Sequence, residues 1–89
     1  MPLFMISYDL RKARNYQPVY DKLAEWRAAS LLESLWLADL TGTAGAVREV
    51  LKGLVDSDDA VAVIELKAQS GWATLNAQSA GVEWLKRHL

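Results

Sequence analysis

LFMISYDL, residues 3–10, is the stretch that decides the fold of this 89-residue chain. Apolar side chains occupy both odd and even positions of the stretch, which is typical of a strand buried on two faces. The strand runs into an acid, Asp9, and a basic cluster follows at once: Arg11, Lys12 and Arg14. We therefore expect a central strand with an acidic end beside three cations.

The next segments alternate between helical and strand patterns. Apolar residues at helical spacing predict a helix over residues 16–28, with Pro18 tolerated in its first turn. The apolar segment 30–40 is interrupted only by Glu33-Ser34, which favours two short strands joined by a tight connection. These segments extend the order to strand, helix, strand, strand.

A second helix and a fourth strand complete the pattern. Thr43 is a suitable N-cap for a helix that ends near Val55. Asp56-Ser57-Asp58-Asp59 has the composition of a turn, and the β-branched run 61–66 has the length of a strand. The βαββαβ order predicts an α+β, ferredoxin-like sandwich, in which both helices cover one face of an antiparallel sheet.

The remaining residues extend this core. We expect a single domain over 1–89, with its core in 3–66 and an extension over 70–89. The extension predicts a turn or edge strand at Gly71-Trp72, then an amphipathic helix with Val82, Leu85 and Leu89 on one side. His88 stands next to the last residue and is expected to be frayed. Because both faces of the first strand are apolar, we expect this extension and a second subunit of a two-fold homodimer to cover the other face.

Composition limits the possible chemistry. The formal net charge is −1 and the pI about 5.7, which argues against binding of nucleic acid through bulk positive charge. The chain has no cysteine and one histidine, so disulfides, thiolates and histidine-based metal sites are nearly excluded. No apolar stretch approaches the length of a membrane span, about 20 residues. We expect a soluble cytoplasmic protein without a membrane partner.

Two candidate functional features remain, and each has a plain structural alternative. Asp9 is a candidate magnesium ligand and catalytic acid, since carboxylate oxygens are preferred by Mg²⁺; alternatively it is a strand-end acid that forms a turn bond or pairs with a nearby arginine. A candidate phosphate-binding cluster consists of Arg11, Lys12 and Arg14. Its alternative is a solvated loop. The chain's tryptophans are interpreted as core or dimer contacts rather than base-stacking platforms: Trp26, Trp36, Trp72 and Trp84.

Three segments together resemble a known family. FMISYDLRK, SLLESLWLADL and DSDDAVAVIEL are similar, in order and spacing over about residues 3–66, to the signature regions of the CRISPR-associated Cas-two family. Relatives of that family include the virulence-associated protein D toxins and the SinR-like proteins. The tail GWATLNAQSAGVEWLKRHL is most similar to the SinR-like branch.

The resemblance implies a ferredoxin-like homodimer in which Asp9 approaches its symmetry mate and the pair holds Mg²⁺. In the family such a pair is associated with cleavage of RNA or DNA, and also with an architectural role in spacer acquisition. By the same matching, Tyr8 supports Asp9, Arg11 and Lys12 lie near phosphates, and Ser34 takes the place of a small polar residue. The implied function is that of a metal-dependent endonuclease, here an endoribonuclease, or a nucleic-acid-binding protein of a CRISPR or defence system.

The sequence also departs from the family. Members that bind duplex DNA tend to be basic, whereas the second helix here offers only Arg48 and Lys52. We therefore expect single-stranded RNA rather than duplex DNA. The alternative function is that of a non-catalytic dimeric scaffold or adaptor, or of a toxin–antitoxin component, in which Asp9 is structural.

Overall fold

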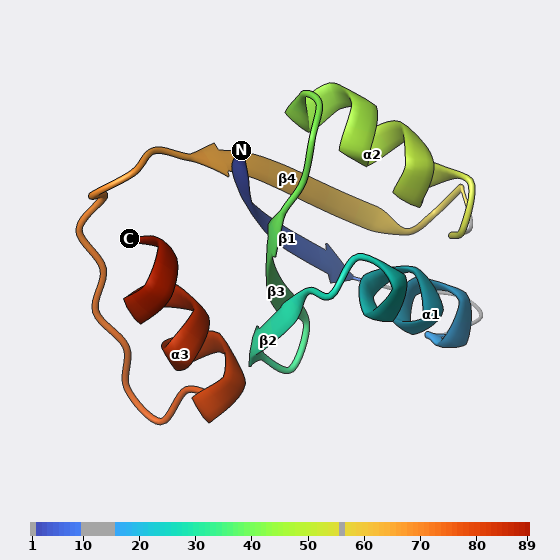
Figure 1. Cartoon of the computed structure of the whole chain (residues 1–89). Coiled ribbons are helices and arrows are strands. Elements are labelled where there is room, and N and C mark those ends of the chain that lie inside the picture. Colours follow the sequence, from blue (N-terminus) through green and yellow to red (C-terminus); the bar gives the residue numbers. More distant parts are fainter. Residues whose placement is uncertain (1, 10–15, 56) are drawn as a thin grey trace.

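The computed structural model describes residues 2–9, 16–55 and 57–89. Four strands and three helices follow one another along these residues (Figure 1). Their order and bounds are β1 (Leu3–Asp9), α1 (Gln17–Glu25), β2 (Ala29–Leu32), β3 (Leu35–Asp39), α2 (Ala44–Lys52), β4 (Ala60–Leu66) and α3 (Ser79–His88).

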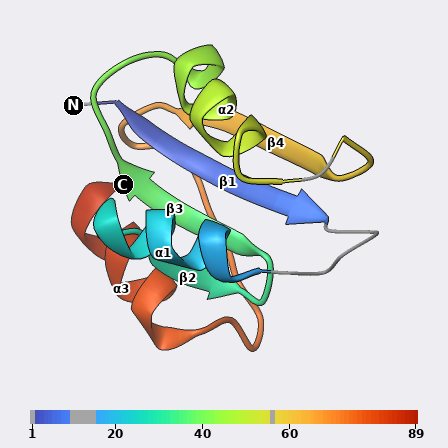
Figure 2. The ribbon, with the colours of Figure 1, turned by 90° about the vertical axis from the view of Figure 1, so that its right-hand side faces the viewer.

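The four strands form one antiparallel sheet in the order β2-β3-β1-β4. The helices α1 and α2 lie together on one side of this sheet (Figure 2). The arrangement is the ferredoxin-like α+β plan, with a C-terminal helix added, as the sequence predicts. Because β1 lies between β3 and β4, the end of β1 lies in the interior of the sheet rather than at an edge.

The main core lies between the sheet and the first two helices. It consists of buried residues from β1, β3, α1 and α2: Phe4, Ile6, Tyr8, Val19, Leu23, Ala38, Val47 and Leu51. The even-numbered residues of β1 therefore face these helices. Each fully buried side chain of this size contributes about 1.5–3 kcal/mol relative to an exposed one, so this layer supplies most of the stability of so small a domain.

The opposite side of the sheet carries a second, smaller core beneath α3. Its buried members come from β1, β3 and α3: Leu3, Leu37, Trp84 and Leu85. The helix packs on β2 and β3 of its own chain, so the C-terminal extension does cover part of the second face. Trp84, rather than Val82, is the large residue that the helix buries.

The boundaries of α1 differ from the predicted range of 16–28 because the chain reverses at Arg27, which has a φ of 56°. Arg27 N–H donates to the carbonyl of Ala24 (3.0 Å) and Ala28 N–H to that of Leu23 (2.9 Å), the paired bonds that close a helix through a left-handed residue. The usual residue at such a position is glycine. Arginine there gave no recognisable stop signal in the sequence.

The start of α2 is as predicted, because Thr43 Oγ1 accepts a hydrogen bond from Ala46 N–H at 3.1 Å. Two predictions for the C-terminal extension are wrong. Gly71-Trp72 forms neither the predicted turn nor the predicted edge strand, since both residues lie in the irregular segment 67–78. His88 is not frayed: its ring stacks on Trp84 at 4.1 Å, its Nδ1 lies 2.9 Å from the Trp84 carbonyl, and its Nε2 lies 3.8 Å from Asp39 Oδ2. These contacts close the end of α3 onto β3. Within the described residues, no helix has the length and apolar character required to cross a bilayer.

Candidate functional site

Asp9 is the last residue of β1 and is exposed. Side chains alternate along a strand, so Asp9 shares a face with Met5 and Ser7, opposite the face of the main core. Residues directly opposite in antiparallel strands share a face, and the register pairs Asp9 with Ala60, Ser7 with Ala62 and Met5 with Ile64. We name these six residues of β1 and β4 the open face: Met5, Ser7, Asp9, Ala60, Ala62 and Ile64.

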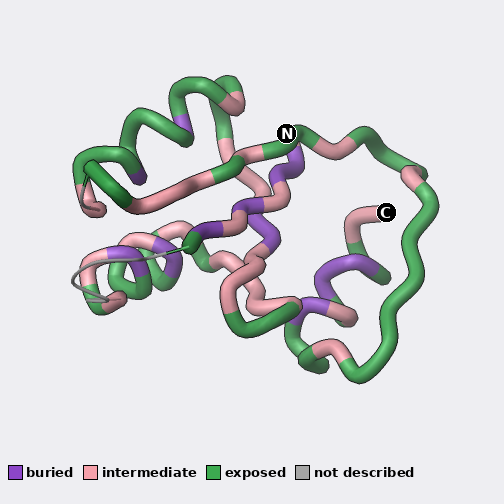
Figure 3. Tube along the Cα trace, turned by 180° about the vertical axis from the view of Figure 1, so that it is seen from behind, coloured by how far each residue is buried: buried purple, intermediate pink, exposed green. Residues whose placement is uncertain are grey.

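The open face lies beside the half of the sheet that α3 covers. The helix packs on β2 and β3, whereas Ala62 is exposed and Ile64 is 50% exposed. Seen from behind, β4 is exposed or only partly buried along its length (Figure 3). Asp9 therefore lies at the border of an incompletely covered, mainly apolar surface.

The Asp9 carboxylate is a suitable ligand for Mg²⁺, which prefers oxygen donors. However, Mg²⁺ requires near-octahedral coordination, which one carboxylate does not complete. Across residues 2–9, 16–55 and 57–89, no three His, Cys, Asp or Glu side chains come together. Of the open-face neighbours of Asp9, Ser7 alone carries a side-chain oxygen. One described chain thus fits a metal only in part, and a complete carboxylate site requires donors from outside it.

The predicted phosphate-binding residues cannot be placed with Asp9. Arg11, Lys12 and Arg14 lie outside the described residues, as does Asp56 of the acidic turn. The described part of that turn, Ser57 and Asp58, does form a turn. The basic cluster therefore stays a prediction of the sequence.

Tyr8, which the resemblance relates to Asp9, points to the opposite side of the sheet. It is buried, and its hydroxyl accepts a hydrogen bond from Trp36 Nε1 at 3.2 Å. Its backbone N–H donates to the carbonyl of Ser34 at 3.3 Å, which ties the end of β1 to the β2–β3 turn. Burial raises the pKa of Tyr8 to about 12, so the phenol is neutral at physiological pH. Tyr8 can therefore support Asp9 only through the backbone that the two residues share.

Further aromatic rings extend from Tyr8 to the surface. Tyr16 lies 5.8 Å from Tyr8 and is stacked with Tyr20, with 5.7 Å between ring centroids and 15° between planes. Tyr20 in turn lies 6.1 Å from Trp36 and is 37% exposed. A cavity of about 160 Å³ at this point is lined by Tyr16, Tyr20, Glu33 and Ser34. We name these four residues the tyrosine cavity.

Sequence reasoning singled out only Ser34 among the residues of the tyrosine cavity. Tyr16 and Tyr20 are four residues apart, a spacing that places two helical residues side by side, and this signal was available in the sequence. Nothing in the sequence relates these two tyrosines to Glu33, because the β2–β3 turn comes close to α1 only once the sheet has formed. Of the tryptophans, Trp84 is buried, Trp26 and Trp36 pack against the main core, and Trp72 is 39% exposed.

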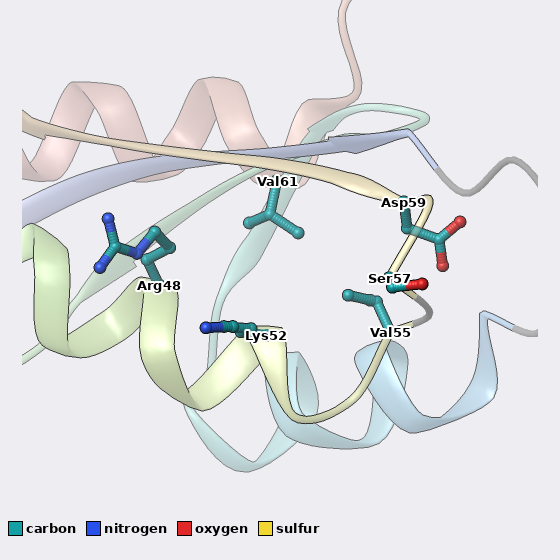
Figure 4. Close-up of a pocket in the computed structure, with 6 residues that line it drawn as sticks. All are labelled: Arg48, Lys52, Val55, Ser57, Asp59 and Val61. Atoms are coloured by element: carbon teal, nitrogen blue, oxygen red, sulfur yellow. The ribbon is translucent and has the colours of Figure 1, made fainter.

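A larger hollow of about 470 Å³ lies between α2 and β4 (Figure 4). Val55 and Val61 form its apolar part. The cationic ends of Arg48 and Lys52 lie at one end and the oxygens of Ser57 and Asp59 at the other. Arg48 also pairs with Glu49 at 3.1 Å. Because the polar groups of its described lining do not converge on one point, these residues form no arranged set of catalytic groups.

The chain's fold agrees with the plan that the Cas-two resemblance implies. Many unrelated functions share that plan, so the fold by itself does not identify an activity. No family model matches this chain.

Proposed function

We propose that this chain is a Cas-two-like homodimeric, magnesium-dependent endonuclease that acts on single-stranded RNA, with one Asp9 from each copy holding the metal. The observation that carries the proposal is the position of Asp9: it is exposed, it closes the central strand β1, and it lies at the end of the open face. A carboxylate in that position can meet its own symmetry mate when two open faces pack together.

The open face is suited to a second copy of the same chain. A two-fold interface brings the same patch of each subunit together, so an apolar patch meets an apolar patch. Ile64 is half exposed next to Met5 and Ala62, and its burial in a dimer would contribute about 0.8–1.5 kcal/mol, half of its full apolar value. The second copy also supplies the additional carboxylate that the described part of one chain lacks.

In this proposal the chain's own residues bind and orient, and the metal provides the charge. Bound Mg²⁺ lowers the pKa of a coordinated water and stabilises negative charge on a phosphodiester. Asp9 holds the cation at the end of β1. The basic residues that follow bind the phosphates of the RNA strand: Arg11, Lys12 and Arg14. The overall charge of −1 confines phosphate binding to such a local cluster.

The direct test is cleavage of labelled single-stranded RNA and DNA with Mg²⁺ or Mn²⁺ by the wild type and by Asp9→Asn. We expect metal-dependent cleavage of RNA by the wild type and its loss in the variant, because an amide cannot replace the carboxylate charge. Asp21→Asn is the matched control, since Asp21 is an exposed carboxylate on α1. Equal activity in Asp9→Asn, with folding unchanged, would show that Asp9 is structural.

The dimer has a separate test that does not depend on activity. Ile64→Lys introduces a charge into the open face and should convert a dimer into a monomer in light scattering. Val50→Lys is the control, because Val50 is 44% exposed on α2, outside the open face. A monomeric wild type would contradict the paired-aspartate site.

A second function, that of a non-catalytic dimeric scaffold or adaptor, is favoured by one observation. The described residues of one chain bring no three metal-ligating side chains together. In this case the wild type is a dimer, binds nucleic acid or a protein of a defence or toxin–antitoxin system, and cleaves nothing. Binding without cleavage in the test above would support this function.

A further inference from the structure

We propose that the tyrosine cavity is a recognition site for one unpaired guanine base of a bound RNA strand. This inference rests on the proposed function, because it assigns a substrate preference to the strand that would reach Asp9. The site is formed by the described residues Tyr16, Tyr20, Glu33 and Ser34, beside the end of β1.

The size of the cavity decides what part of a ligand it can hold. Sites for whole small molecules are about 300–1,000 Å³, whereas the tyrosine cavity is about 160 Å³. A single flat ring system fits this volume, while its sugar and phosphate would lie outside. Proteins that recognise single-stranded RNA use such sites, in which an unstacked base lies against an aromatic ring.

The aromatic side of the cavity is fixed in place. Tyr16 and Tyr20 are stacked, and Tyr20 also contacts Trp36. The contact of Tyr16 with Tyr8 and the bond from Trp36 Nε1 to the Tyr8 hydroxyl link these rings to β1 and β3. Since Tyr20 is 37% exposed, part of its surface is available to a stacking base.

The polar side of the cavity selects the base. An ionised Glu33 offers two acceptor oxygens, and the Ser34 hydroxyl can donate. Among the described residues, no hydrogen bond or ion pair engages the Glu33 carboxylate. The pairing edge of guanine carries two adjacent donors, N1–H and the N2 amino group, followed by the O6 acceptor. Guanine alone among the four bases thus matches a carboxylate beside a hydroxyl, whereas adenine, cytosine and uracil each place a ring acceptor or a carbonyl against the carboxylate.

The cavity and Asp9 lie at the same end of the sheet. The β2–β3 turn that carries Glu33 and Ser34, the end of β1 and the start of α1 lie close together (Figure 2). The bond from Tyr8 N–H to the Ser34 carbonyl joins that turn to the residue just before Asp9. A strand whose base enters the cavity on one side of β1 therefore has its backbone near the strand end that carries Asp9.

The test is binding of short oligouridylates that contain one central guanosine, adenosine or cytidine, measured by fluorescence anisotropy. The protein carries Asp9→Asn and no metal is added, so that cleavage does not interfere. We expect the guanosine oligomer to bind about 5- to 150-fold more tightly than the others, the range for one bidentate base contact. Glu33→Gln should remove this preference, whereas Glu25→Gln, a change of an exposed carboxylate at the end of α1, should leave it intact.

A second pair of variants separates stacking from packing. Tyr20→Leu should weaken binding of every oligomer about 5- to 150-fold, because the stacking surface is lost. Tyr20→Phe should bind like the wild type, since it keeps the ring. The indole N–H resonance of Trp36, which contacts Tyr20, reports directly on the cavity, and 5′-GMP alone should shift it.

The outcomes distinguish this inference from the proposed function. Tight binding of all oligomers with no preference for guanosine would overturn the guanine site and leave the nuclease proposal standing. A Trp36 shift with 5′-GMP but no oligomer binding would support the site and contradict the nuclease. If neither ligand binds, both are wrong. If N-acetyl-arginine amide shifts Trp36 and 5′-GMP does not, the cavity accepts a peptide cation and the inference is wrong.

Discussion

Replacement of Gly81 by alanine should shift α3 on the sheet and destabilise the fold. Gly81 is buried where α3 crosses β2. A Cβ built at this position lies 2.5 Å from Leu31 Cα, 2.7 Å from Leu31 Cβ and 2.7 Å from the Ser30 carbonyl oxygen. Two of these three atoms belong to the backbone, so no side-chain rotation can relieve the contact. Either the helix or the strand has to move.

The expected loss of stability follows from two opposing contributions. Overpacking of a tight contact costs about 1–3 kcal/mol, and backbone contacts this short favour the upper end. Alanine recovers up to about 1 kcal/mol of helix propensity. The net loss is therefore about 2 kcal/mol, or a fall in melting temperature of roughly 8–16 °C for a domain of this size. Complete release of α3 would expose Trp84 and Leu85, at about 1.5–3 kcal/mol each, so the helix should shift and remain bound.

The assay is thermal unfolding followed by circular dichroism, with another helical glycine as the control. Gly45 lies in α2, and the nearest atom to an added Cβ is Thr43 Oγ1 at 3.9 Å. Gly45→Ala should therefore keep or raise the melting temperature, because alanine adds up to about 1 kcal/mol of helix propensity to the free energy of unfolding. If Gly81→Ala is as stable as Gly45→Ala, α3 does not pack on β2 as closely as described, and the reasoning fails.

Two further changes test the end of α1 and the buried phenol. Arg27→Gly should raise the free energy of unfolding by about 1 kcal/mol, because glycine adopts the φ of 56° without the steric cost that other residues have. A lower free energy of unfolding, measured by urea denaturation, would contradict the left-handed helix end. Burial raises the pKa of Tyr8 from 10.0 to about 12, so its favourable contribution is complete below pH 10 and is lost as the pH rises through about 12. Thermal unfolding between pH 9 and 12 should therefore show a steeper decline in the wild type than in Tyr8→Phe, and equal slopes would show that Tyr8 titrates normally.

The main core could be predicted from the sequence because its signals are local and periodic. The apolar stretch forms the central, largely buried strand β1 over residues 3–9, and the β-branched run 61–66 lies in β4, although β4 is an edge strand that is only half-buried or exposed. The Thr43 cap forms as predicted. For these segments the burial required by the fold agrees with local propensity, which is the usual condition for a correct prediction.

Other features depend on contacts between distant residues and gave no local signal. The close approach of Gly81 to Leu31 depends on how α3 crosses β2, and Trp84 is buried because of that crossing. His88 is ordered by Trp84 and Asp39, which its position near the terminus did not indicate. The candidate site follows the same division. A strand-end acid can be identified from sequence, whereas the grouping of two tyrosines with Glu33 appears only when the β2–β3 turn meets α1.

The position of α3 also determines what a second copy can reach. Because Gly81 lets the helix approach β2, α3 covers β2 and β3 and leaves the β1–β4 half of the same face less covered. A partner subunit that packs on the sheet must then use the half that carries Asp9, and two copies related by a two-fold axis present that half to each other. Since α3 occupies the β2–β3 half of this face, a dimer formed through the face would be centred on β1 and β4 rather than on β2. In this view, the glycine that permits packing of α3 on its own chain is also what makes a paired-aspartate site geometrically possible.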